Sequence, residues 1–364
     1  MPAPDAAPPA ARLRSGASPA IVANGLGLAL QAPGRALAPG RWYAAAGLSG
    51  IWVSAAPPGA LAAAPAIALD AVEAQALAYL VAFDLGDFDL GFALGTEHPR
   101  LGWSARVRAE QRDARLPGPD GFDSAAPLAR TGLLAPPLLD QVVASFTGGF
   151  KREHGAFSHG ALAAANHGSH YGFVEQGVVF SQLQPGLATL LVQGDGRLEM
   201  ATWSAALAQR LGALRHARQN GVPLVEPAAD GAPMVGRLVT QWGAGNWSGS
   251  ADEQLRTLRA GACVLAHQGR RFLVYGYFSS ATPRAMANVF IAYGCSYAMH
   301  LDMNALEHTY LALYLRSGAQ LGVEHLVPGM SVLDKTLGIT LLPRFLSFPD
   351  DRDFFYLTRK AARP

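Results

Sequence analysis

Short apolar runs bounded by turn residues recur along the chain, and they predict many short β-strands. The segment 259–278, RAGACVLAHQGRRFLVYGYF, places Gln268–Gly269 between two such runs, and the segment 188–203, ATLLVQGDGRLEMATW, places Asp195–Gly196 in the same way. An Asp-Gly dipeptide supplies the positive φ angles that a tight turn needs. Both segments therefore predict β-hairpins. Apolar residues that alternate on either side of the turn LGD predict a third hairpin over 77–95.

Two segments instead show the three- and four-residue spacing of a helix. Thr282 caps the first and Pro283 fits its first position, whereas Gly294 ends it, so we expect a helix over 283–293. Its apolar stripe is Met286, Val289, Phe290 and Tyr293. Ser204 caps the second, which we expect over 204–220. Its apolar stripe is Leu207, Leu211 and Leu214.

Composition divides the chain into three parts. Residues 1–38 are rich in Pro and Ala and predict a flexible tail without regular structure. Residues 39–129 predict an N-terminal β-rich region that ends in a polar loop, and 130–364 predict a second domain. With 40 Gly and 25 Pro the chain has many turns. We therefore expect an α+β fold of mainly β, mixed sheets with a few packed helices.

The net charge and the motifs of the sequence exclude several kinds of partner and cofactor. The net charge is +2, which gives no field directed at nucleic acid, so no nucleic-acid partner is expected. The most apolar run, 64–83, contains Asp70 and Glu73 and predicts no transmembrane segment. Residues 1–20 lack the continuous apolar core of a signal peptide. No nucleotide-binding motif is present and we expect no cofactor. Cys263 and Cys295 are either two buried thiols or one disulfide.

The segment that follows the helix predicted over 283–293 is rich in ionisable side chains that are candidates for catalysis. In the strand SYAMHLD, Ala298, His300 and Asp302 share one face, and Asp302 ends the strand. Ligands often bind where a strand of such a fold gives way to a loop. The loop that follows carries Glu307 and His308. The pattern predicts either a catalytic site or a site whose chemistry has been lost.

The order of elements resembles that of the phosphodiester glycosidases, the group that includes N-acetylglucosamine-1-phosphodiester α-N-acetylglucosaminidase. The resemblance covers about 130–315 and rests on SFTGGF (145–150), the hairpin at 259–278, and the helix and strand at 283–302. It implies a phosphodiester glycosidase-like domain, a carbohydrate or sugar-phosphate ligand, and a periplasmic or extracellular location. The chain departs from the family pattern in two places. Thr147 replaces an Asn, and MNAL (303–306) replaces the glycines that follow the matching Asp302.

The resemblance implies hydrolysis of a glycosidic bond, which normally needs two carboxyl groups. Asp302 is the first candidate, with Glu307 or Glu153 as its partner, and Thr147 lies at the other strand end that the resemblance brings alongside. A phosphodiester also needs cationic contacts. Lys151, Arg152 and His154 follow the Gly-Gly turn and, with His300, are the candidate substrate-binding residues, although FKREHG is also typical of an exposed charged loop.

Weaker patterns remain beside these. Four histidines fall at His154, His159, His167 and His170, but their spacing fits no zinc pattern, so we expect no metal. Trp242 and Trp247 could stack on a sugar or simply pack. Three functions stay open: a hydrolase of sugar-1-phosphodiesters or envelope polysaccharide, a catalytically inactive member of the fold that binds glycans, and a structural envelope protein.

Overall fold

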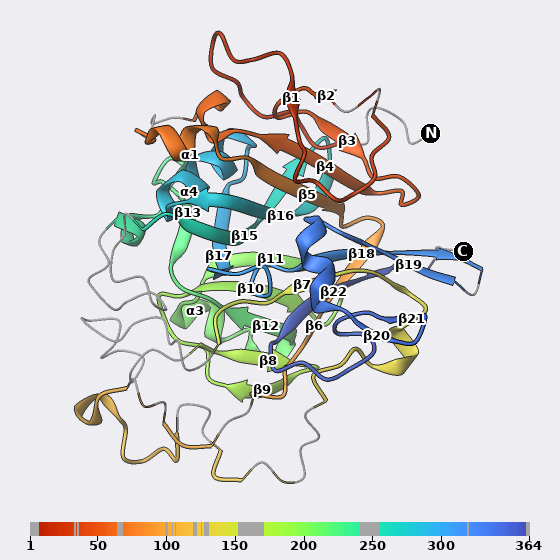
Figure 1. Ribbon diagram of the computed structural model, residues 1–364. Coiled ribbons are helices and arrows are strands. Elements are labelled where there is room, and N and C mark those ends of the chain that lie inside the picture. Colours follow the sequence, from red (N-terminus) through yellow and green to blue (C-terminus); the bar gives the residue numbers. More distant parts are fainter. Residues whose placement is uncertain are drawn as a thin grey trace.

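The computed structural model describes residues 7–32, 34, 36–63, 68–98, 101–103, 105, 107–118, 122–124, 126, 131–151, 171–240, 255–318 and 320–361. Three large β-sheets and a few short helices make up the fold (Figure 1), which confirms the predicted α+β class with mainly β structure. The strand pairings among the described residues are antiparallel. No helix in the described part of the chain is long and apolar enough to span a membrane.

An eight-stranded sheet occupies the upper half of Figure 1. Its strands, in spatial order, are β14 (Pro233–Val235), β13 (Pro223–Pro227), β17 (Tyr297–Met303), β15 (Thr257–His267), β16 (Arg270–Ala281), β5 (Ala78–Asp84), β4 (Ile51–Ala56) and β3 (Trp42–Ala44). The sheet therefore takes strands from both predicted regions, 39–129 and 130–364. The predicted turn at Gln268–Gly269 joins β15 to β16 with positive φ at both residues.

Two five-stranded sheets lie below it. One has the order β19 (Gln320–His325), β18 (Leu311–Ser317), β7 (Val142–Thr147), β22 (Phe354–Arg359) and β6 (Phe88–Ala93). The other has the order β11 (Leu198–Thr202), β10 (Ala188–Gln193), β12 (Leu214–Gln219), β8 (Phe173–Glu175) and β9 (Val178–Ser181). The predicted hairpin at 188–203 is confirmed as β10 and β11, and Gly196 in its turn has φ 83°.

The predicted helix near 283–293 is confirmed as α4 (Pro283–Ala292). The Thr282 side chain accepts a hydrogen bond from Ala285 N at 3.3 Å, and Gly294, with φ 88°, follows the helix end. All residues of α4 except Arg284 are buried, and the helix packs on strands of the eight-stranded sheet. A second short helix, α1 (Ala71–Gln75), is capped by the Asp70 carboxylate.

The strands predicted within 77–95 form, but they do not pair as a hairpin. The first is β5, which pairs with β4 and β16, and the second is β6, which pairs with β22 in another sheet. The turn between them is fixed by Asp84, whose carboxylate accepts Gly86 N at 2.7 Å and contacts Arg270. Every residue of β5 is buried, so packing on both faces favours two separate sheets over a local hairpin.

The prediction of a long helix over 204–220 is correct for the first turn only. Ser204 does cap a helix, α3, but α3 ends at Ala208 and a 3₁₀ turn at Leu211–Ala213 follows. The chain then enters β12, which pairs with both β10 and β8. Two neighbouring strands supply hydrogen bonds to β12 on both edges, and this tertiary pairing outweighs the helical spacing of the leucines.

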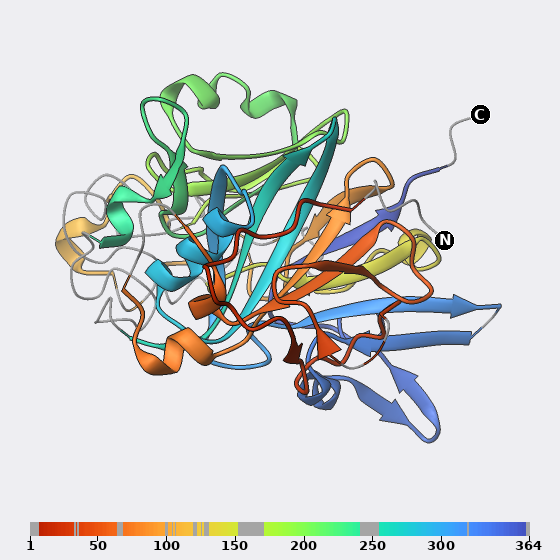
Figure 2. The same ribbon diagram turned by 90° about the horizontal axis from the view of Figure 1, so that it is seen from above.

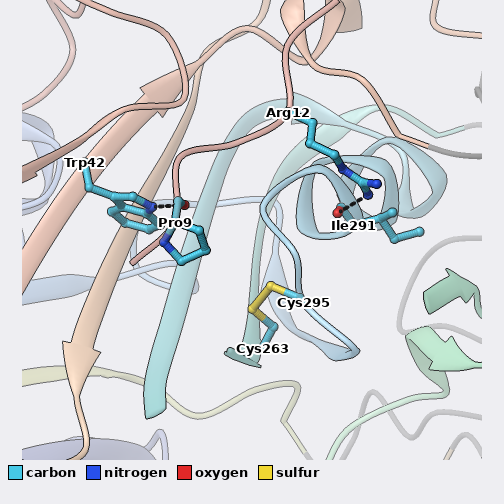
Figure 3. The surroundings of a disulfide bond; sticks show 6 residues. All are labelled: Pro9, Arg12, Trp42, Cys263, Ile291 and Cys295. Carbon is cyan, nitrogen blue, oxygen red and sulfur yellow. Dashed lines mark hydrogen bonds between the residues drawn. A yellow bond between two sulfur atoms is a disulfide. The ribbon is translucent and has the colours of Figure 1, made fainter. Parts of the chain in front are cut away.

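The prediction that residues 1–38 lack regular structure is wrong for the part that the structure describes. The short strands β1 (Ile21–Val22) and β2 (Ala36–Leu37) pair with each other. Trp42 Nε1 donates to Pro9 O at 2.9 Å, and Arg12 Nη2 donates to Ile291 O at 3.0 Å (Figure 3). Arg12 thus binds a carbonyl group in the last turn of α4, where a cation is favourable.

Cys263 and Cys295 form a disulfide, which decides between the two alternatives left by the sequence. Cys263 lies on β15 and Cys295 directly follows Gly294, with a Cα–Cα distance of 6.0 Å (Figure 3). The bond ties the end of α4 to the centre of the eight-stranded sheet.

We expect Cys263→Ala with Cys295→Ala to lower the free energy of unfolding by about 3–4 kcal/mol, because the disulfide closes a loop with a sequence separation of 32 residues. Urea unfolding of both proteins under non-reducing conditions measures this difference. Identical unfolding curves for the two proteins would contradict it.

Candidate active site

Asp302 lies near the end of β17, where β17 gives way to the loop that carries Glu307. Its side chain is only 6% exposed, and both carboxylate oxygens have contacts. Oδ2 accepts a hydrogen bond from Arg352 Nη1, and Oδ1 accepts one from Met303 N at 2.8 Å. His308 Nδ1 lies 3.9 Å from Oδ1. A buried carboxylate with these partners is held in one orientation.

Arg352 holds the second predicted carboxylate as well. Its Nε donates to Glu307 Oε1 at 3.2 Å, while its Nη1 donates to Asp302. The Arg352 side chain is 3% exposed, but that of Glu307 is 45% exposed. One guanidinium therefore joins a buried carboxyl group and a solvent-facing one, Asp302 and one of its two predicted partners.

The two carboxyl groups differ in acidity. Burial raises the pKa of Asp302 to about 7, against the opposing effects of Arg352, the Met303 N–H and Arg218. Partial burial also acts on Glu307, but the hydrogen bond and charge of Arg352 outweigh it and lower the pKa of Glu307 below its ordinary value. Near neutral pH, Asp302 is thus able to hold a proton while Glu307 is ionised.

Arg352 belongs to a run of four charged residues, 350–353, that we call the ion-pair segment. Each member binds a residue from a different part of the chain. Asp350 binds Arg344 at 2.7 Å, Asp351 binds Lys151, Arg352 binds Asp302 and Glu307, and Asp353 binds Arg218 at 2.8 Å. The segment therefore fixes the loops after β7 and β17 relative to each other.

The Arg218–Asp353 pair is the most deeply buried part of this network. The side chains are 0% and 3% exposed, and Arg218 donates to both carboxylate oxygens, at 2.8 and 3.2 Å. Arg218 also donates to Phe150 O at 2.8 Å and to Asn220 Oδ1 at 3.0 Å. Its guanidinium lies over the Tyr171 ring at 5.3 Å. These contacts satisfy a charge that would otherwise be very unfavourable in the interior.

The Gly148–Gly149 turn of SFTGGF packs directly on this pair. A Cβ atom at Gly148 would lie 2.2 Å from Asp353 Oδ2, and one at Gly149 would lie 2.9 Å from the Arg218 guanidinium. Only glycine allows so close an approach. The turn that the sequence presented as part of a ligand loop therefore also has a packing function.

Thr147 is buried at the end of β7, and its Oγ1 donates to Glu307 O at 3.2 Å. Arg344 Nη1 donates to the same carbonyl oxygen at 2.8 Å. The ends of β7 and β17 are therefore connected through the Glu307 loop. Thr147 holds that loop by its backbone, whereas the predicted catalytic carboxyl groups bind Arg352.

His300 lies in the interior, with no exposed surface. Its Nε2 is 3.3 Å from Arg259 Nη1, and its ring centroid is 5.0 Å from that of Phe150. Burial and the nearby Arg259 charge keep the pKa of His300 well below its ordinary value, so the ring is neutral. Two of the four residues of MNAL (303–306), Met303 and Leu306, are also engaged. Met303 Sδ accepts from Arg259 at 3.0 Å, and Leu306 packs beside Gly329.

Several predicted residues lie outside the described residues. These are Arg152, Glu153, His154, His159, His167, His170, Trp242 and Trp247. Lys151 is described, and its Nζ contacts Asp351 at the partly exposed side of the network. Among the described residues, no group of three or more His, Cys, Asp or Glu side chains is placed to hold a metal ion.

The chain is similar to solved structures of low sequence identity. The catalytic domain of zebrafish N-acetylglucosamine-1-phosphodiester α-N-acetylglucosaminidase, auto-inhibited by its pro-peptide, is 10% identical, with a TM-score of 0.44 over 97% of this chain and 88% of that one. A hypothetical protein from Synechocystis is 12% identical, with a TM-score of 0.41 over 92% and 68% of the two chains. A putative exported protein from Burkholderia pseudomallei is 12% identical, with a TM-score of 0.34 over 78% and 74%.

These values describe a coarse similarity of overall fold, and they give no residue of this chain a role. The sequence matches no protein-family model and no curated protein. The chemistry of the site has to be judged from its own geometry.

Sequence reasoning missed the residues that assemble the site. Arg352 and Asp353 follow the predicted block by 50 residues, and Arg218 lies in a segment predicted to be helical. One signal was available, because PDDRD places four charged residues together in a chain that is only 15% charged. Such a cluster in an apolar chain predicts either an exposed loop or a set of ion pairs, and the structure shows the second.

Proposed function

We propose that the protein is a hydrolase that cleaves a glycosidic bond, with Asp302 as the general acid and Glu307 as the general base. One observation carries the proposal: a single guanidinium, that of Arg352, holds two carboxyl groups whose pKa values are displaced in opposite directions. Pairs of this kind are typical of acid–base catalysis on sugars. The substrate class is a sugar-1-phosphodiester or an envelope polysaccharide.

In the proposed reaction, protonated Asp302 donates its proton to the leaving-group oxygen as the bond from the anomeric carbon breaks. Ionised Glu307 accepts a proton from the water molecule whose oxygen bonds to that carbon. The products are the free sugar and the protonated leaving group. Arg352 orients both carboxyl groups, and Thr147 and Arg344 hold the Glu307 loop by its backbone carbonyl.

A phosphodiester leaving group needs a nearby cation. Lys151 lies on the partly exposed side of the network, with its side chain 23% exposed and its partner Asp351 50% exposed. A pair in contact with solvent can rearrange to bind an anionic group at little expense, because surface ion pairs are weak. This supports Lys151 as the phosphate-binding residue.

The location of the protein is also a proposal. A buried disulfide persists in oxidising surroundings such as the periplasm or the cell exterior. The Cys263–Cys295 bond therefore supports the periplasmic or extracellular location that the family resemblance implies.

The test of the proposed function is sugar release from a panel of sugar-1-phosphodiesters and polysaccharides by the purified protein. We expect hydrolysis of at least one phosphodiester by the native protein, and release at least about 100-fold slower by Asp302→Asn. Equal sugar release by the native protein and the variant would overturn the proposal.

The pH dependence of that reaction follows from the two carboxyl groups. Glu307 must be ionised, so activity rises as pH increases through its lowered pKa. Asp302 must be protonated, so activity falls as pH increases through about 7. We expect a bell-shaped profile of kcat/KM with its alkaline limb near 7. A profile that stays flat from pH 5 to 9 would contradict the assignment of Asp302 as the acid.

A second candidate function is glycan binding without catalysis. Asp302 is buried with both oxygens engaged, and Met303 takes the place of a family glycine. Titration calorimetry with the same panel separates the two functions. Saturable binding without release of sugar would favour the binding protein.

A further inference from the structure

A hairpin beyond the candidate site exposes an unusual amount of apolar surface. It consists of β20 (Lys335–Leu337) and β21 (Thr340–Leu342), and Figure 2 shows it in blue, projecting from the lower right of the molecule. The exposed fractions are 73% for Leu337, 105% for Ile339 and 41% for Leu341, and Val332, in the 3₁₀ helix just before the hairpin, is 78% exposed. The three most exposed large apolar side chains of the described residues therefore lie within eight positions. Such a patch marks an interaction site.

The register shows what kind of partner can cover the patch. Leu337 lies opposite Thr340, and Leu341 lies opposite Thr336. Because paired residues of a hairpin share a face and neighbours along a strand alternate, Leu337 and Leu341 point to opposite faces. Ile339 lies in the turn between the strands. A flat protein surface could cover only one face of the hairpin. A medium that surrounds the hairpin tip contacts Leu337, Ile339 and Leu341 together.

The charge of the hairpin fits the same partner. Residues 335–343 contain one charged side chain, Lys335, and no acid. Lys335 lies opposite Leu342, at the end of the hairpin away from the turn. When the turn enters an apolar layer, Lys335 reaches the level of the polar headgroups, where anionic lipids attract a cation.

The base of the hairpin is fixed to the wall of the candidate site. Asp334 Oδ1 accepts Arg344 N at 2.9 Å, which joins the two ends of the hairpin, and His325 Nε2 lies 3.1 Å from Asp334 Oδ2. Arg344 also donates to Glu307 O at 2.8 Å. A partner that binds the hairpin is therefore held in a fixed position relative to the Glu307 loop.

We propose that the β20–β21 hairpin docks the protein on a lipid surface with anionic headgroups, with Leu337, Ile339 and Leu341 entering the apolar layer and Lys335 at the headgroups. Binding of this kind grows with the apolar area that is buried and with the charge attraction. It is reversible, because one short hairpin buries few side chains. The proposal does not depend on the hydrolytic function.

The test is co-sedimentation of the full-length protein with vesicles of phosphatidylcholine, with and without phosphatidylglycerol. We expect the native protein to bind, and Leu337→Ser with Ile339→Ser to weaken binding by more than about tenfold, because two apolar side chains no longer enter the lipid. We expect Lys335→Gln to lose about fivefold, and only on vesicles that contain phosphatidylglycerol.

Val178→Ser is the matched control, since Val178 on β9 is 49% exposed but lies in another sheet. It should bind as the native protein does, and so should Asp302→Asn, which separates docking from catalysis. Equal vesicle binding by the native protein and the double variant would overturn the proposal. A native dimer in analytical ultracentrifugation that the double variant abolishes, without vesicle binding, would assign the hairpin to self-association and overturn it as well.

Discussion

Replacement of Asp302 with Asn is expected to lower kcat/KM for glycosidic hydrolysis by about 10²–10⁴-fold, the usual contribution of a general acid. Asn keeps the shape of the side chain, and its single oxygen can still accept one of the two hydrogen bonds, from Met303 N or from Arg352, which donate to different oxygens of Asp302. It cannot donate the proton. Steady-state kinetics with the best substrate of the panel measures the loss, and circular dichroism checks that the fold is retained.

Asp140→Asn is the control for that experiment, because the Asp140 side chain is 95% exposed and lies 3.7 Å from Arg316. It should retain full activity. Glu307→Gln provides a second variant if Asp302→Asn unfolds, and it should also lose activity since the base is removed. Full activity of both site variants would end the assignment of the two carboxyl groups.

Replacement of Asp353 with Asn is expected to lower the free energy of unfolding by about 3–5 kcal/mol, because Arg218 keeps its charge in the interior without a counter-charge. Arg218 has no exposed surface, and its remaining hydrogen-bond acceptors, Phe150 O, Gln219 O and Asn220 Oδ1, are neutral. Urea unfolding followed by tryptophan fluorescence measures the change.

Two comparisons make this result specific to the buried pair. Asp195→Asn removes a carboxylate that is 63% exposed and 3.8 Å from Arg197, and it should change stability by no more than about 0.5 kcal/mol. Arg218→Met combined with Asp353→Leu should recover much of the loss, because no unpaired charge remains. A loss for Asp353→Asn as small as that for Asp195→Asn would show that the pair does not hold the network together.

The local elements of the fold were predictable where local signals agree with tertiary structure. Thr282, Pro283 and Gly294 fix both ends of α4, and Gln268–Gly269 fixes the β15–β16 turn. The pairing of distant strands was not predictable in the same way. The turn after Asp84 suits a hairpin, yet it leads from one sheet into another, because strands from the far end of the chain provide better partners.

The N-terminal segment shows the same limit. Pro and Ala give little apolar surface, so the composition of residues 1–38 predicts a flexible tail. Its described part is instead held by hydrogen bonds from single side chains, such as Arg12 to the carbonyls of α4. A contact made by one residue does not change the amino-acid composition, so composition cannot predict it.

Of the residues in the candidate site, only the two carboxyl groups could be predicted to act together from the sequence. Asp302 and Glu307 were found because a carboxylate at a strand end is a recognisable pattern, and both are held by one guanidinium. Arg352 could not be assigned to them from the sequence, since the contact spans 50 positions. Thr147 does end a strand, but β7 lies in another sheet than β17, and the Thr147 hydroxyl donates to the Glu307 backbone carbonyl.

The proposed mechanism requires Asp302 to hold a proton near neutral pH while its neighbour Glu307 is ionised. The most direct measurement is an NMR titration of the Asp302 carboxyl carbon in protein labelled with ¹³C at aspartate side chains, assigned by its disappearance in Asp302→Asn. The account predicts a transition near pH 7, in keeping with the effect of burial on the Asp302 pKa. A transition at or below the ordinary value of 3.8 would contradict it.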